Sequence, residues 1–137
     1  MEQLTLKPRA RYSIANKRYN NKNFAYDIPA LVENVKQIHS WKGANLNAII
    51  LLKNPNKSVV LTSMHEGTEI YSFQSNKAII LHIIEGRIKF YTHSDSVTLE
   101  KGQLLTLHEK IKYRLKSMEE TVFILTVINR IYASKNN

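Results

Sequence analysis

From Leu46 onward the sequence is a succession of short runs rich in β-branched and aromatic residues, with turn signals such as Asn54-Pro55-Asn56 between them. Short strands joined by tight turns are typical of antiparallel sandwiches and barrels. The pattern therefore predicts an all-β jelly-roll barrel that is closed by its last strand. The nine predicted strands span residues 47–52, 58–64, 69–73, 78–84, 87–92, 96–99, 103–107, 112–115 and 121–128.

Residues 1–43 have a different composition, which is basic and rich in asparagine. Asp27-Ile28-Pro29 predicts a helix start, because Asp caps a helix N-terminus and Pro fits its first turn. Apolar residues then recur at helical spacing, so we expect a short helix over 29–36. The predicted organisation is a basic arm with this short helical segment over 1–43, one β-barrel domain over 44–130 and a frayed tail over 131–137.

Composition limits the class of protein. The chain has 137 residues and no cysteine, so one hydrophobic core is expected, and disulfides, thiolate catalysis and cysteine-based zinc sites are excluded. No apolar run is long enough to span a membrane, and the first residues lack the apolar segment of a signal peptide. We therefore expect a cytoplasmic protein without a membrane partner.

The formal net charge is +9, and much of it lies near the N-terminus. Residues 1–24 contain six basic side chains and one acidic side chain. One interpretation is a solvated arm that aids solubility. The other is attraction to an acidic partner such as nucleic acid, with Tyr12 and Tyr19 as stacking residues. The absence of a groove-reading motif favours the solvated arm.

Three of the four glycines have an informative spacing. Gly67 is followed at intervals of six, eight, twelve and nineteen residues by Phe73, Ser75, Ile79 and Gly86. This spacing resembles the first motif of the cupin superfamily, in which the three intermediate positions are His, His and Glu. The resemblance implies a cupin-type double-stranded β-helix, similar to small single-domain bacterial cupins of the RmlC-like type.

The second cupin motif has the same kind of match. The family places Pro, Gly and His at the positions that are His108, Lys110 and Tyr113 here, after Gly102. The resemblance thus covers the motif spacing and not the metal ligands.

A metal in this fold is held by imidazole nitrogens and a carboxylate, which these side chains cannot supply. We therefore expect no metal and no cofactor. The apolar replacements instead predict a pocket for a neutral small molecule or a packed core. The predicted ligand pocket comprises Phe73, Ser75, Ile79, Leu81 and Tyr113.

Two histidines have specific expectations. His108 begins the second-motif loop, and with Tyr113 it is the candidate acid/base pair for a metal-independent enzyme. His82 is expected on the outer face of its strand together with Ile80 and Ile84, because Ile79 is taken to point inward. Cupin subunits commonly meet on that face, so the resemblance implies a homodimer.

Three functions remain open on this basis. The first is a metal-free, non-catalytic module that binds or senses an unidentified small molecule. The second is a metal-independent isomerase or epimerase that uses His108 and Tyr113. The third is an interaction protein that binds an acidic partner through its basic arm.

Overall fold

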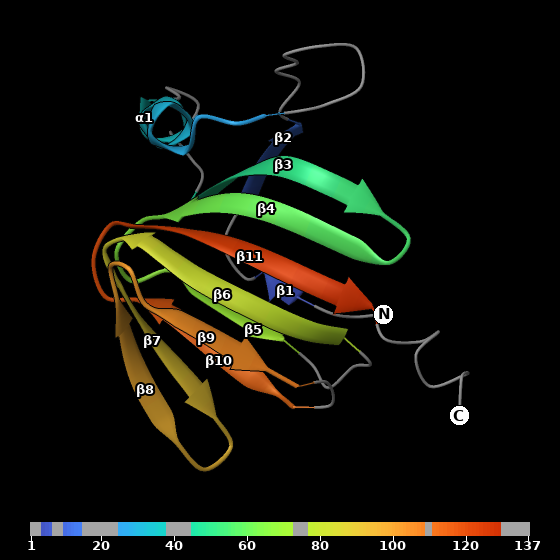
Figure 1. Cartoon of the computed structure of the whole chain (residues 1–137). Helices are drawn as coiled ribbons and strands as arrows, with labels where there is room; N and C mark the ends of the chain where they lie inside the picture. The colour runs from blue at the N-terminus through green and yellow to red at the C-terminus, as the bar shows by residue number, and fades with distance from the viewer. Residues whose placement is uncertain are drawn as a thin grey trace.

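The computed structural model describes residues 4–6, 10–14, 25–37, 45–72, 77–108 and 111–129. Within these ranges two sheets face each other, and a single helix lies on the outside of one of them (Figure 1). The five-stranded sheet has the order β1-β5-β10-β7-β8, and the six-stranded sheet has the order β2-β3-β4-β11-β6-β9. The sheets form a jelly-roll sandwich that is not closed into a continuous barrel.

The elements have the following bounds. The strands of the five-stranded sheet are β1 Leu4–Leu6, β5 Glu69–Ser72, β7 Arg87–Thr92, β8 Ser96–Glu100 and β10 Tyr113–Ser117. Those of the six-stranded sheet are β2 Ala10–Ile14, β3 Leu46–Asn54, β4 Lys57–Met64, β6 Lys77–Glu85, β9 Leu104–Leu107 and β11 Thr121–Asn129. The helix α1 spans Ile28–Gln37.

All nine strands predicted after Leu46 are confirmed, and the helix begins one residue earlier and ends one residue later than predicted. Two expectations differ from the structure. The N-terminal arm contributes β1 and β2, and β2 pairs in parallel with β3. The last strand β11 lies between β4 and β6 rather than closing an edge, because its long apolar run is buried most fully at the centre of the sheet.

Helix α1 is capped and packed as its sequence suggests. The Asp27 carboxylate accepts a hydrogen bond from the Ala30 amide at 3.2 Å, which satisfies one of the free amides of the first turn. Val32 and Val35 are buried against the outer face of the six-stranded sheet, where they meet Leu61. The helix therefore covers one part of this face. It is too short to cross a membrane, and the described residues contain no other helix.

The main core lies between the two sheets. Along β6, Ile79, Leu81 and Ile83 are buried and alternate with partly exposed residues, as a strand with one face in the core requires. His82 therefore lies on the outer face, as predicted.

A β-bulge in β3 changes which side chains enter the sandwich. The register shifts between Ile50 and Leu52, so that Leu52 pairs with Val59 on the outer face and is 43 % exposed. The Tyr26 hydroxyl donates a hydrogen bond of 3.0 Å to the Leu51 carbonyl, which the bulge leaves outside the ladder. Beyond the bulge, Lys53 lies opposite Ser58 on the inner face.

Candidate functional site

The sandwich has two ends with different chemistry. At one end, which we call the glycine end, Gly67 and Gly86 lie in turns. At the other, the hairpin end, β3 turns into β4 between Asn54 and Lys57. Each end presents polar groups that a ligand could contact.

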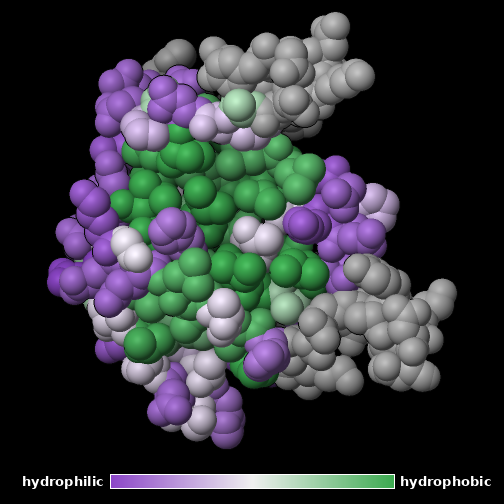
Figure 2. Space-filling view, viewed as in Figure 1, coloured by the Kyte–Doolittle hydropathy of each residue, from purple (hydrophilic) through white to green (hydrophobic). Residues whose placement is uncertain are grey.

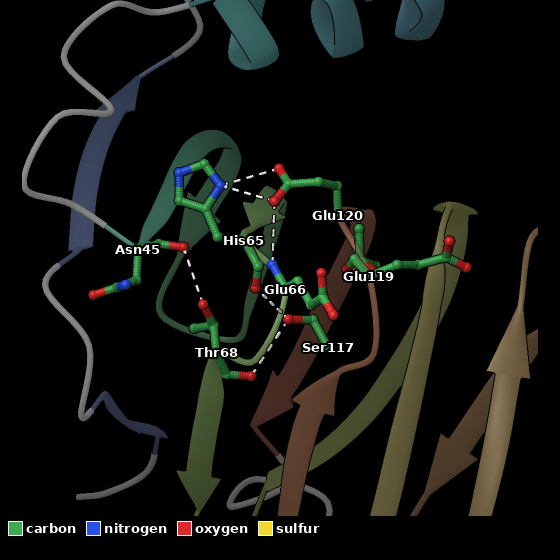
Figure 3. A network of polar contacts seen from close by, with 8 residues as sticks. Asn45, His65, Glu66, Thr68, Ser117, Glu119 and Glu120 are labelled. Carbon is green, nitrogen blue, oxygen red and sulfur yellow. Dashed lines mark hydrogen bonds and ion pairs between the residues drawn. The ribbon is translucent and has the colours of Figure 1, made fainter.

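A polar network links two turns at the glycine end (Figure 3). The Nδ1 atom of His65 lies 3.0 Å from both carboxylate oxygens of Glu120, and the Glu66 amide donates to the same carboxylate at 3.2 Å. The Ser117 hydroxyl donates to the His65 carbonyl, and the Gly67 amide donates to the Ser117 carbonyl at 2.8 Å. The network thus holds the turn after β4 against the turn before β11.

The geometry at this end supports a structural role. The side chains of His65 and Glu120 are 38 % and 66 % exposed. Exposed ion pairs contribute little to a folded structure on their own, so the backbone hydrogen bonds carry most of the attachment.

The hairpin end contains a hollow of about 620 Å³. Of the described residues that line it, three are lysines and none carries a carboxylate. We call it the basic hollow, and it is lined by Lys53, Asn54, Pro55, Asn56, Lys57, Ser58, Lys77, Val127 and Asn129.

Strand register brings lysines from three strands to this hollow. The bulge in β3 places Lys53 beside Ser58 on the inner face of the sheet. Lys77 lies two residues before buried Ile79 on the same face of β6, and Val127 of β11 pairs with Ile79. The basic hollow is therefore the polar continuation of the main core at the hairpin end.

The rim of the basic hollow is held by backbone contacts. The Asn54 side-chain oxygen accepts hydrogen bonds of 2.9 Å from the amides of Asn56 and Lys57, which fixes the tight turn. The Asn129 amide donates to the Asn56 carbonyl at 2.8 Å. The hairpin is thus tied to the end of β11.

Its electrostatic character follows from the lining. Three lysines and no carboxylate among the described lining residues give the hollow a positive charge, which favours an anion. Lysine is a mobile point charge with three donors, so it suits phosphate and carboxylate oxygens in several orientations. The hollow is therefore suited to a small organic anion.

The residues of the predicted ligand pocket lie elsewhere. Ile79, Leu81 and Tyr113 are together in the main core, and the Tyr113 ring stacks on Phe90 with the centroids 5.2 Å apart. Their side chains are at most 7 % exposed, so they belong to packed interior. Phe73 and Ser75 lie outside the described residues.

The candidate acid/base pair is divided between two environments. His108 is exposed directly after β9, whereas Tyr113 begins β10 with its ring in the core. A role for these two residues in catalysis stays a prediction.

The metal site expected of the cupin motifs does not fit the residues present. In the described part of the chain, no three His, Asp or Glu side chains come together as metal ligands would. At the motif positions that are described, Ile79 has no donor atom and Tyr113 is packed against Phe90. These positions support apolar packing instead.

Sequence reasoning did not identify the lysines of the basic hollow. Lys53 and Lys57 flank the Asn-Pro-Asn turn, so the sequence did indicate two lysines on one hairpin. The inward direction of Lys53 depends on the bulge, which has no marker in the sequence such as a glycine.

Comparison with known proteins supports the fold. No protein-family model matches the chain, and no curated protein matches it in sequence. Solved structures do match. The cupin domain of Cnp3 from Schizosaccharomyces pombe aligns with a TM-score of 0.60 and 17 % identity, over 67 % of this chain and 70 % of that chain.

Two further structures extend the likeness. KdgF from Halomonas sp. aligns with a TM-score of 0.58 and 12 % identity, over 63 % of this chain and 82 % of that chain. A mutant of salicylate 1,2-dioxygenase from Pseudoaminobacter salicylatoxidans aligns with a TM-score of 0.66 and 13 % identity, over 81 % of this chain and 36 % of that chain. At such identities the likeness concerns the fold, and the fold hosts more than one kind of protein.

Proposed function

We propose that this chain, which has the cupin fold, is a metal-free, non-catalytic module that binds a small organic anion in the basic hollow and acts as a homodimer. The observation that carries the proposal is the convergence of Lys53, Lys57 and Lys77 on one hollow whose described lining has no carboxylate. The rest of the interior between the sheets is packed mostly by apolar side chains, so this end differs from it in chemistry.

Size and lining support a small molecule as the ligand. A volume of about 620 Å³ falls within the range of about 300–1,000 Å³ that is usual for small-molecule sites. Val127 and Pro55 offer apolar contact, and Ser58 and Asn129 offer polar groups beside the lysines. The ligand class that fits is a compound with two or more phosphate or carboxylate groups on a small carbon skeleton.

The lining also supports binding rather than turnover. General acid–base catalysis most often uses histidine or a carboxylate within hydrogen-bond reach of the reacting group. Neither residue type is present among the described residues that line the basic hollow.

The proposal is tested by calorimetric titration with pyrophosphate and with citrate. Removing one charge-assisted contact costs about 1.5–3 kcal/mol, so Lys53→Gln and Lys77→Gln are each expected to weaken binding about tenfold or more. Lys101→Gln is the matched control, because Lys101 is exposed in the turn between β8 and β9. Equal affinity in all three variants would exclude the basic hollow as the site.

The homodimer is proposed on the outer face of the six-stranded sheet. Figure 2 shows apolar surface spread across the centre of this face, over β4, β11 and β6. Ile80 and His82 lie there, partly exposed, and the edge strand β9 adds Leu104, which is 55 % exposed. An apolar area of this kind on a small protein is typical of an interface.

Light scattering after size-exclusion chromatography tests the dimer. A charge in an apolar interface is not compensated, so Ile80→Asp is expected to give a monomer while the native chain elutes as a dimer. Thr98→Asp is the matched control, because Thr98 is exposed on the other sheet. A native monomer, or a dimer that Ile80→Asp leaves intact, would refute this interface.

A further inference from the structure

The outer face of the five-stranded sheet is a second basic surface, separate from the basic hollow. Antiparallel register places Arg114 of β10 between Tyr71 of β5 and Tyr91 of β7. The next row on the same face places Lys116 directly opposite Lys89. We call these five residues the Tyr–Lys face.

The three cations of the Tyr–Lys face outnumber the carboxylate beside them. That carboxylate is Glu69, which accepts hydrogen bonds from the Tyr71 hydroxyl at 2.6 Å and from Arg114 at 3.4 Å. These contacts hold its pKa below the ordinary value, with the Tyr71 hydrogen bond as the main cause, and Lys116, which lies opposite Glu69 in the strand register, also lowers it. Lys89 and Lys116 remain opposite each other, an arrangement of like charges that destabilises a strand pair.

Aromatic and guanidinium planes accompany the charges. The Arg114 guanidinium lies 3.8 Å from the centroid of the Tyr91 ring, and the Lys89 ammonium lies 5.6 Å from the same centroid. Both tyrosines are partly exposed, and they are separated by one strand, or about 10 Å at normal strand spacing. The face thus presents stacking surfaces next to cations.

We propose that the Tyr–Lys face binds single-stranded nucleic acid. The lysines contact backbone phosphates, which relieves the repulsion between them, and bases stack on the tyrosines and on the Arg114 plane. An acidic peptide would use the cations alone, whereas a nucleic acid strand uses the cations and the planar groups together.

Fluorescence anisotropy with a labelled oligothymidylate of about twelve nucleotides tests the proposal on the full chain. The Lys89→Ala/Lys116→Ala double variant is expected to lower the slope of log K against log salt by about 1.4, since each phosphate contact contributes about 0.7 on single strands. Tyr91→Leu is expected to weaken binding at least about fivefold through loss of stacking, and Tyr91→Phe, which retains the ring, is expected to recover most of that loss.

The control is Lys36→Ala/Lys101→Ala, which removes the same charge from α1 and from the turn between β8 and β9, outside both the Tyr–Lys face and the basic hollow. The proposal requires that this variant keep the native affinity and slope. An equal loss of affinity in both double variants would overturn the proposal, because it would show only a general attraction of the oligonucleotide to a basic protein. Competition by polyglutamate as effective as that by the unlabelled oligonucleotide, or native affinity in Tyr91→Leu, would also overturn it. Thermal melts of every variant confirm that each is folded.

Discussion

Gly86 lies where two connections cross, and a methyl group at this position is expected to be costly. The residue has φ of +90°, a conformation that L side chains resist. A Cβ atom built at Gly86 would also lie against the Glu120 carbonyl oxygen, at the end of the turn before β11, and 2.6 Å from the hydroxyl of Thr121, the first residue of β11. Gly86→Ala therefore combines backbone strain with overlap against neighbouring backbone.

Gly102 separates these two effects. It has φ of +85°, but nothing lies within 4 Å of a Cβ atom built there. Gly102→Ala is expected to cost about 1–2 kcal/mol from strain alone. Gly86→Ala adds about 1–3 kcal/mol of overpacking, for a total of about 2–5 kcal/mol.

Urea unfolding followed by circular dichroism measures both variants. At about 4 °C per kcal/mol, the melting temperature should also fall by about 4–8 °C for Gly102→Ala and about 8–20 °C for Gly86→Ala. Equal losses of stability in the two variants would mean that a methyl group at Gly86 meets no overlap with the neighbouring turn. A larger loss for Gly102→Ala would refute the reasoning.

Three further changes test the packing and the charges. Thr121→Val is expected to cost about 1–3 kcal/mol in urea unfolding, because the buried hydroxyl accepts from the Arg87 amide at 3.2 Å and donates to the Arg87 carbonyl at 3.1 Å. Val35→Ala should cost about 2 kcal/mol in the same assay, since its fully buried side chain anchors α1, and an unchanged midpoint would argue against that docking. The pKa of Glu69 is lowered on folding, so its stabilising contribution is present above the unfolded pKa and is lost as the pH falls through the folded value. Unfolding between about pH 5 and pH 3 should thus show a steeper loss of stability for the native chain than for Tyr71→Phe.

Local patterns in the sequence predicted most of the fold. The runs rich in β-branched residues in β6 and β11 indicated the strands, and Asp27 with Pro29 indicated the helix start. These features depend on residues close together in the chain. The pairing of β1 and β2 with different sheets depends on distant partners, and these two strands are only three and five residues long, too short for a strong signal in the sequence.

The candidate site was less predictable, for a related reason. The cupin spacing located the core positions Ile79 and Tyr113 but carried no information about what replaces the metal. The basic hollow depends on the bulge that turns Lys53 inward and on register that brings Lys77 near it from another strand. Both are properties of strand pairing rather than of any short motif.

An amide-resolved NMR titration with pyrophosphate tests the central claim most directly. Binding in the basic hollow predicts saturable shifts at Lys53, Lys57, Lys77 and Asn129, with little change at Tyr113 in the core. Saturable shifts centred on Tyr113 and Leu81, or no saturable shift at the hairpin end, would contradict the account.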